Sequence, residues 1–227
     1  MIKHHPTYEL LKNYVDGALP ASLSAGVAIH LEMCPECQSK VIYLTEQKAE
    51  ESFEALISSN IDVPSTDLPE LSTLSFDQMI SKITESDDVV ESQLSIEKVI
   101  EIKGNKFKLP AVLNNITIGK ASHVGKLTRA RLQLNEGEIH SSLLCIEPGG
   151  SVPEHTHKGF ELTVLLAGSF SDNNGDYVKG DFILLDQEHH HHPISENGCL
   201  CYTVANDALH FTQGLNKLLN PIGSFIY

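Results

Sequence analysis

The hydrophobic positions of residues 1–50 recur every three or four residues, which is the spacing of one face of an α-helix. Thr7 is placed to cap a first helix. Gly17 and Pro20 interrupt the chain, and a second helix follows from about Ala21. Pro35 fits the first turn of a third helix. The expected apolar stripes of these helices are Leu10, Leu11, Tyr14 and Val15, then Leu23, Val27, His30, Leu31 and Cys34, then Val41 and Leu44.

A break follows at about residue 60, where prolines and serines gather at Pro64, Ser65, Pro69 and Ser72. One more short helix is predicted beyond it, because Ser75 and Gln78 have the spacing of a capping box. Its apolar face follows at helical spacing and comprises Phe76, Met79, Ile80 and Ile83. Residues 84–95, TESDDVVESQLS, have the composition of a flexible tether.

From Ile96 the pattern changes to short runs of Val, Ile, Leu, Thr and Phe between turn signals. The turns are Asn114-Asn115, Pro148-Gly149-Gly150, Asp172-Asn173-Asn174-Gly175 and Lys179-Gly180-Asp181. Strands at this spacing indicate a sandwich or barrel rather than βαβ units. We therefore expect two domains, a small all-α domain over residues 1–85 and an all-β domain over residues 102–227, joined by an acidic linker over residues 86–101.

The chain carries a formal charge of −14, and most of it lies in residues 50–101, which hold 13 acidic and two basic residues. Such a balance argues against direct nucleic-acid binding, which needs a basic face. The acidic segment is either a solvated linker or a docking surface for a basic partner. No apolar stretch reaches the roughly 18–20 residues that span a bilayer, and the first residues have no apolar signal core. Five cysteines, an odd number, favour a reducing cytoplasm.

A first set of metal-binding residues has the pattern H-x3-C-x2-C and consists of His30, Cys34 and Cys37. His30 and Cys34 lie one helical turn apart on the same face, and Cys37 follows the turn at Pro35. Zinc prefers four such ligands in a tetrahedron, so His4 or His5 is expected to supply the fourth. A closed site of this kind is structural. The alternative is a redox C-x-x-C pair.

A second set lies in the β region, where Gly149 begins the run GGSVPEHTHKGFELTVLLAG. His155 and His157 are two residues apart and share one face of a strand, and Glu161 follows from the next β segment. This resembles the first cupin motif, and Gly180-Asp181 with the later histidines resembles the second. The family's barrel holds one metal through three His and one Glu. Strand alternation splits the run His189–His192 into two pairs, 189 with 191 and 190 with 192. The alternative is a barrel that keeps its histidines as polar filling without a metal.

The amino-terminal segment HHPTYELLKNYVDGALPASLSAGVAIHLEMCPEC, followed by a cupin and by LHFTQGLNKLLNPIG, is similar to ChrR-type zinc-binding anti-sigma factors. The resemblance implies a helical zinc domain that clamps an extracytoplasmic-function sigma factor, and a cupin domain that helps to release it under singlet-oxygen or related oxidative stress. It implies zinc in both sites, with Fe, Mn or Ni as alternatives in the cupin. The implied ligands are His5, His30, Cys34 and Cys37 in the helices, and His155, His157, Glu161 and, from a His-x-Pro reading, His191 in the cupin, with His189 in reserve.

The helix with the face Phe76, Met79, Ile80 and Ile83 is our candidate for binding the sigma factor. The alternative is that it packs on the zinc domain. Cys199 and Cys201 share one strand face, where they either sense oxidants near the metal or are small buried hydrophobes, and Cys145 is expected in the core.

A second function class is a metal-dependent cupin enzyme, a dioxygenase or an isomerase, because three His and one Glu leave coordination positions open. Tyr177, Tyr202 and Arg131 are then candidates to line the barrel, although nothing in their spacing requires it.

Overall fold

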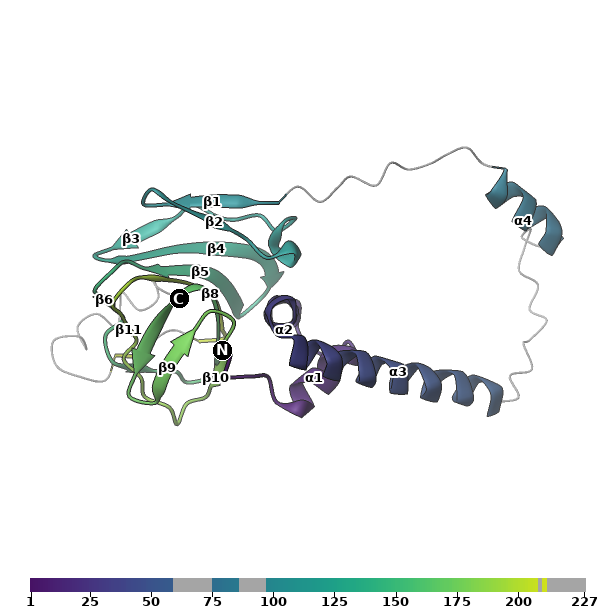
Figure 1. Cartoon of the computed structure of the whole chain (residues 1–227), viewed down its shortest axis with the longest axis horizontal. Coiled ribbons are helices and arrows are strands. Elements are labelled where there is room, and N and C mark those ends of the chain that lie inside the picture. Colours follow the sequence, from purple (N-terminus) through teal and green to yellow (C-terminus); the bar gives the residue numbers. More distant parts are fainter. Residues whose placement is uncertain (59–74, 86–96, 208–209, 212–227) are drawn as a thin grey trace.

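The computed structural model describes residues 1–58, 75–85, 97–207 and 210–211 (Figure 1). The predicted break between Pro64 and Ser72, nearly all of the tether 84–95 and nearly all of the terminal motif 209–223 lie outside these residues. The helices of the described part are α1 (Tyr8–Val15), α2 (Ala21–Met33), α3 (Pro35–Ser58) and α4 (Phe76–Thr84), with a short 3₁₀ helix η2 (Ala111–Leu113).

The helix boundaries predicted from capping residues are confirmed. The Thr7 side chain accepts a hydrogen bond from the backbone N–H of Leu10 at the start of α1. Pro35 opens α3. Ser75 and Gln78 form the reciprocal capping box at the start of α4. Short polar side chains satisfy N–H groups that the helix itself leaves free, so these residues identify helix starts from sequence alone.

Most of the described residues from 97 onward form a curled antiparallel β-sheet of the cupin type, as predicted. Its central strands follow the order β3-β4-β5-β12-β8-β11-β6, and β9 and β10 also pair with β8. β1 starts at Val99, so strand structure begins slightly before residue 102. The strands are β1 (Val99–Ile102), β2 (Asn105–Lys108), β3 (Ser122–Val124), β4 (Leu127–Glu136), β5 (Ile139–Ile146), β6 (Gly150–Ser151), β7 (His155–Thr156), β8 (Glu161–Asp172), β9 (Gly175–Val178), β10 (Phe182–Leu185), β11 (Ile194–Ser195), β12 (Cys199–Ala205) and β13 (His210–Phe211).

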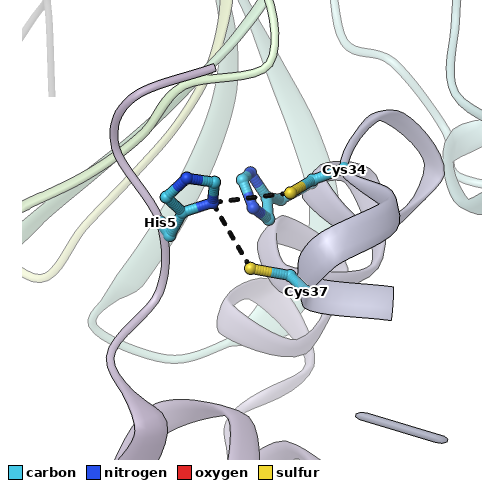
Figure 2. Close-up of side chains that lie close together, drawn as sticks. His5, Cys34 and Cys37 are labelled. Carbon is cyan, nitrogen blue, oxygen red and sulfur yellow. Dashed lines mark hydrogen bonds between the residues drawn. The ribbon is translucent and has the colours of Figure 1, made fainter. Parts of the chain in front are cut away.

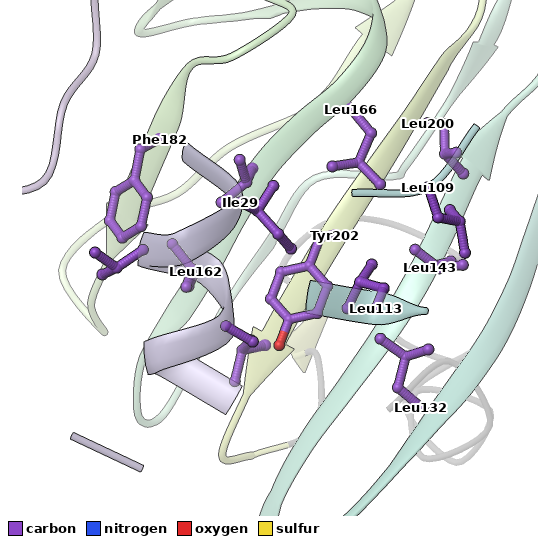
Figure 3. Packing of buried hydrophobic residues seen from close by; sticks show 14 of the residues in the cluster. Ile29, Leu109, Leu113, Leu132, Leu143, Leu162, Leu166, Phe182, Leu200 and Tyr202 are labelled. Carbon is purple, nitrogen blue, oxygen red and sulfur yellow. The ribbon is translucent and has the colours of Figure 1, made fainter. Parts of the chain in front are cut away.

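Strand β12 is buried on both of its faces, which explains why its sequence is a continuous apolar run. Cys199 and Cys201 face one hydrophobic cluster, inside the barrel. Leu200, Tyr202 and Val204 face a larger cluster on the other side, which also contains buried residues of α2. Figure 3 shows Tyr202 in this second cluster near Ile29 and Leu162. The outer face of the barrel therefore forms part of a core shared with the helices.

Helix α2 corrects one expectation from the sequence. We predicted a one-sided apolar stripe, but the helix is buried on several sides, because α1 and α3 contact it together with strands of the barrel. Its buried residues are Ser22, Ala25, Gly26, Val27, Ile29 and His30. A helix enclosed by two layers needs small or apolar residues around most of its circumference, so a stripe pattern does not describe it.

Close packing and hydrogen bonds join α2 to the barrel. A Cβ atom built on Gly26 would lie 2.5 Å from Leu162 Cδ2, so the helix backbone approaches β8 as closely as glycine allows. The buried Tyr202 hydroxyl donates to the carbonyl oxygen of Ser22 at 2.8 Å. The Glu136 carboxylate of β4 accepts the backbone N–H groups of Ala21 and Ser22. It thereby caps a helix whose own N-cap, a proline, offers no side-chain acceptor.

In the described part of the chain, none of the helices combines the length and apolar character that crossing a bilayer requires.

The hydrogen bond between Tyr202 and Ser22 gives a direct test of this packing. In Tyr202→Phe the ring remains, but the carbonyl oxygen of Ser22 loses its donor, so the free energy of unfolding should fall by about 1 kcal/mol. Chemical denaturation of the full chain measures the difference. Tyr8→Phe, at a side chain that is 61% exposed, is the matched control and should leave stability unchanged. Equal stability of both variants would contradict the docked arrangement of α2.

Candidate metal centres

The first candidate centre lies where the N-terminal segment meets the junction of α2 and α3. Figure 2 shows His5 facing Cys34 and Cys37, with its Nδ1 atom 3.4 Å from each sulfur. A tetrahedral zinc with usual bond lengths places nitrogen and sulfur ligands about 3.5 Å apart. His30 completes the set, and all four ligand atoms lie within 4.8 Å of one another. The sequence prediction left His4 or His5 open from spacing alone, and the structure brings His5 to the cluster.

The protonation of His30 follows from its partner. Its Nδ1 lies 2.7 Å from the carbonyl oxygen of Gly180, which can only accept, so Nδ1 carries the proton. The lone pair is then on Nε2, and among the described residues this buried atom has no hydrogen-bond partner. Burial lowers the pKa of His30, which keeps the ring neutral. A buried, neutral imidazole with an unused nitrogen lone pair fits a metal ligand.

The two cysteines are buried and reduced. Burial, together with a hydrogen bond and charge from Cys34, raises the pKa of Cys37 to about 12. Thiolates, however, are the form that binds metals, so a cation at this position would supply the charge that removes the thiol proton. If all four residues bind one tetrahedral ion, no position is left for water, which is the arrangement of a structural site.

The second candidate centre is inside the barrel and collects His155, His157, Glu161 and His191. Glu161 Oε2 lies 2.6 Å from His157 Nε2, 3.9 Å from His155 Nε2 and 4.0 Å from His191 Nε2. His155 Nε2 and His191 Nε2 are 2.8 Å apart. All three imidazoles thus direct Nε2 toward one point beside a carboxylate, which is the donor set of a divalent metal site.

Backbone pairing places two of these ligands together. His155 and His191 exchange N–H to carbonyl hydrogen bonds, each of 3.2 Å, as an isolated antiparallel bridge. Glu161 is the first residue of β8 and pairs with Leu185, the last residue of β10. Neighbouring loops and strand ends therefore hold the cluster before any ion binds.

Two of the three rings have partners that fix their orientation. His155 Nδ1 donates to the carbonyl oxygen of Pro153 at 2.8 Å. His191 Nδ1 lies 3.5 Å from Asp172 Oδ2, whose side chain is 2% exposed. Within the described ranges, His157 Nδ1 is buried without such a partner. These contacts leave Nε2 of His155 and His191 available for a metal.

Glu161 is ionised in this environment. Burial acts to raise the pKa of its carboxyl group, but the adjacent His157 and hydrogen bonds from His155 and His157 outweigh it, and the net pKa lies well below the usual value. The site therefore presents a carboxylate and three imidazoles to an incoming cation.

The histidine run does not behave as the strand that we assumed. β10 ends at Leu185 and β11 begins at Ile194, so the run lies in a connecting loop and strand alternation does not apply. His191 is buried in the cluster. His189 is exposed and binds Asp186 with its Nδ1 at 2.7 Å. The choice of His191, taken from the family resemblance, agrees with this placement.

A cavity of about 60 Å³ adjoins the barrel cluster. His155, Glu161 and His191 line it, together with Cys201 and Arg129. Tyr177, Tyr202 and Arg131, the candidates for a catalytic lining, are not among its wall residues. The Cys201 and Cys199 sulfurs are 3.9 Å apart, whereas Cys145 belongs to the cluster on the other face of the sheet.

The sequence analysis missed two buried carboxylates, Asp172 and Asp181, because both lie in turn signals. Asp172 faces a metal ligand, and Asp181 accepts hydrogen bonds from the backbone of residues 3 and 4. Turn aspartates are so common that neither position attracts notice. For Asp181, the one signal in the sequence was its place beside Gly180 in the resemblance to the second cupin motif.

The fold and these clusters define a two-part protein, with helices that carry a His2Cys2 site and a cupin barrel that carries a His3Glu site. Two family models match it: residues 7–38 match a putative zinc-finger family, and residues 124–208 match the ChrR cupin-like domain. The chain resembles ChrR along almost its whole length. It is 29% identical to the anti-sigma-E factor ChrR of Cereibacter sphaeroides over 227 residues. This alignment covers 97% of each chain.

Solved structures also match this chain. The crystal structure of Rhodobacter sphaeroides SigE in complex with the anti-sigma ChrR matches with a TM-score of 0.60 and 25% identity, over 90% of this chain and 100% of that one. An RmlC-like cupin protein from Ralstonia eutropha matches 44% of this chain and 69% of its own, with 16% identity and a TM-score of 0.38.

The contact between Asp172 and His191 gives a test of the barrel site. Asp172→Asn removes the carboxylate that orients the ring, so metal retention by the barrel should fall about 10- to 100-fold. Native mass spectrometry across a chelator series counts the ions that each chain keeps. Asp176→Asn, an exposed aspartate of the adjacent hairpin, should behave as wild type. Identical retention in both variants would show that Asp172 does not support the site.

Proposed function

We propose that this chain is a cytoplasmic, zinc-dependent anti-sigma factor that sequesters an extracytoplasmic-function sigma factor. The observation that carries the proposal is the similarity to ChrR along almost the whole chain, both domains included, together with the match to ChrR in its complex with SigE. A sigma factor acts on RNA polymerase, so its inhibitor belongs in the same compartment.

The exposed face of α4 supports this proposal. Met79 and Ile80 are 42% and 45% exposed and Ile83 is 74% exposed, although they form one apolar face of a well-capped helix. In Figure 1 the helix stands apart from α1–α3 and from the barrel. This arrangement favours binding of a partner over the alternative of packing on the zinc domain. An apolar helix face that another protein covers is a common recognition mode. Phe76 begins the same helix, and we assign it to the same face by its spacing.

In this proposal the helical site holds zinc with a structural role. His5 comes from the segment before α1 and His30 from α2. Cys34 is the residue just before α3, and Cys37 lies in the first turn of α3. One ion bound to all of them fixes the segment before α1 against α2 and α3, and it contributes directly to folding free energy. The barrel site takes zinc or another divalent ion such as Fe, Mn or Ni.

We further propose that the barrel senses oxidants through Cys199 and Cys201. A hydrogen bond from Cys201 is the largest cause of the lowered pKa of Cys199, which makes Cys199 the better nucleophile. Attack by its thiolate on an organic hydroperoxide yields a sulfenic acid and an alcohol. The Cys201 thiol then displaces water and forms a disulfide. The competing interpretation, two small buried hydrophobes, predicts no chemistry at these positions.

The α4 face can be tested with matched charges. Ile83→Glu places a carboxylate on the apolar face and should weaken binding to the sigma factor at least about tenfold, because a charge would be buried in the interface. Ser81→Glu adds the same charge on the opposite face of α4 and should bind nearly as wild type. Affinity is measured with the purified sigma factor encoded beside this chain. Failure of the wild-type chain to form a complex would refute the proposed function.

The cysteine pair has its own test, which uses the preformed complex. Cys199→Ser with Cys201→Ser should slow the release of the sigma factor by an organic hydroperoxide at least about tenfold, because no disulfide can form. Cys145→Ser, which alters a buried thiol on the other face of the sheet, should respond as wild type. Release followed by size-exclusion chromatography at fixed times gives the rates. Wild-type release from the double variant would assign the pair to packing.

A metal-dependent cupin enzyme, a dioxygenase or an isomerase, is the second candidate. The cavity beside His155, Glu161 and His191 favours it, since a small ligand in this space would reach the ion. Iron in the purified barrel, with oxygen uptake in the presence of a small chelating substrate, would establish this activity. The absence of oxygen uptake by iron-loaded protein with such a substrate would exclude a dioxygenase.

A further inference from the structure

The N-terminal strap, residues Ile2–His5, runs over the cupin turn, residues Val178–Phe182, immediately before it reaches the helical metal site. The carbonyl oxygen of His4 accepts the backbone N–H of Phe182 at 3.0 Å. The His4 ring lies 4.8 Å from that of Tyr177, just before the turn. His5, a candidate ligand, is therefore the next residue after a segment held by the barrel.

Asp181 is the main hydrogen-bonding group of the turn and is fully buried. Its Oδ1 atom accepts the backbone N–H groups of Lys3 at 2.7 Å and His4 at 3.0 Å. Its Oδ2 atom accepts the backbone N–H of Val178 at 2.8 Å. One carboxylate thus joins the turn to the strap. Hydrogen bonds to a charged acceptor are stronger than those between neutral groups.

Gly180 contributes a second link, to another candidate ligand. Its carbonyl oxygen accepts the Nδ1 proton of His30, as described above. Its φ angle is +95°, and a Cβ atom at this position would lie 2.5 Å from Ile2 Cδ1. Glycine therefore serves both the backbone conformation and the close approach of the strap.

We propose that the cupin turn Val178–Phe182 is the outer shell of the helical metal site, with Gly180 and Asp181 as positioning residues for His30 and His5. The affinity of a site in the helices thereby depends on groups that belong to the barrel. This inference rests on the proposed zinc site but not on the binding of a sigma factor.

These contacts of the strap and of His30 exist in the metal-free protein. With the strap docked, His5 is placed before the ion arrives, and the carbonyl of Gly180 selects the tautomer of His30 that leaves Nε2 available. Without these contacts, the ion itself must order the strap and orient both rings. Outer-shell partners of this kind change metal affinity 10- to 100-fold in other sites.

The test uses Co²⁺ bound to the full chain, because absorption from thiolate to cobalt reports the site with Cys34 and Cys37 and is silent for an all-N/O barrel site. Lys3→Pro removes one N–H that Asp181 accepts, at an exposed residue outside the barrel core. Lys3→Ala keeps that N–H and is the matched control. Asp181→Asn perturbs the same link from the barrel side. Asp176→Asn, at an exposed aspartate of the barrel, is the control on that side.

We expect Lys3→Pro and Asp181→Asn to weaken Co²⁺ and Zn²⁺ binding at the thiolate site about 10- to 100-fold in competition with a chelator. Lys3→Ala and Asp176→Asn should stay within about twofold of wild type, because the strap keeps its hydrogen bonds. If Asp181→Asn does not fold, the comparison of Lys3→Pro with Lys3→Ala tests the inference by itself.

Two results would overturn the inference. Equal affinity of wild type and Lys3→Pro, with an intact thiolate band, refutes it and leaves the zinc site standing. No thiolate band in the wild-type chain refutes the proposed zinc site, and this inference fails with it.

Discussion

The burial of α2 between α1, α3 and the outer face of the barrel is the constraint on which the rest of the structure depends. Gly26 lets the helix backbone approach Leu162 so closely that no larger residue fits without a shift. Tyr202 and Glu136 then satisfy polar groups of the same helix from the barrel side. Because α2 also carries His30, the packing that joins the two parts is the packing that positions a metal ligand.

One short strand connects the two candidate centres. β10 begins at Phe182, whose N–H binds the strap at His4, and ends at Leu185, which pairs with Glu161. The strand that pairs with Glu161 is thus also the strand that holds the segment before His5. Interior packing transmits shifts because it is dense and has few voids. The geometry gives the barrel a direct physical route to the helical site.

Sequence reasoning succeeded where a local rule determines the structure. The capping residues Thr7 and Ser75 and the proline that opens α3 act over a few residues, so spacing alone identified them. Spacing also found His30, Cys34 and Cys37 and His155, His157 and Glu161, whereas His5 and His191 came from the family resemblance. Sequence reasoning was incomplete about the burial of α2 and wrong about the histidine run. Positions at helical spacing describe one face of α2, but the helix is buried on several sides. Strand alternation holds only within a strand, and residues 189–192 lie in a loop. Both cases concern surroundings supplied by distant residues. Asp181 was missed for the same reason, since its partners lie almost the whole chain away.

The sequence left open whether the acidic segment is a linker or a docking surface. The exposed face of α4 bears on this choice. Residues 50–101 carry 13 acidic and two basic residues, and the exposed face of Met79, Ile80 and Ile83 lies within them. These features make different contributions to binding. Net charge raises the rate of encounter with a basic partner and adds little affinity at physiological salt. A desolvated apolar face supplies affinity but does not attract a partner from a distance. A segment that combines both is suited to fast capture followed by slow release, which neither a solvated linker nor an isolated helix would provide.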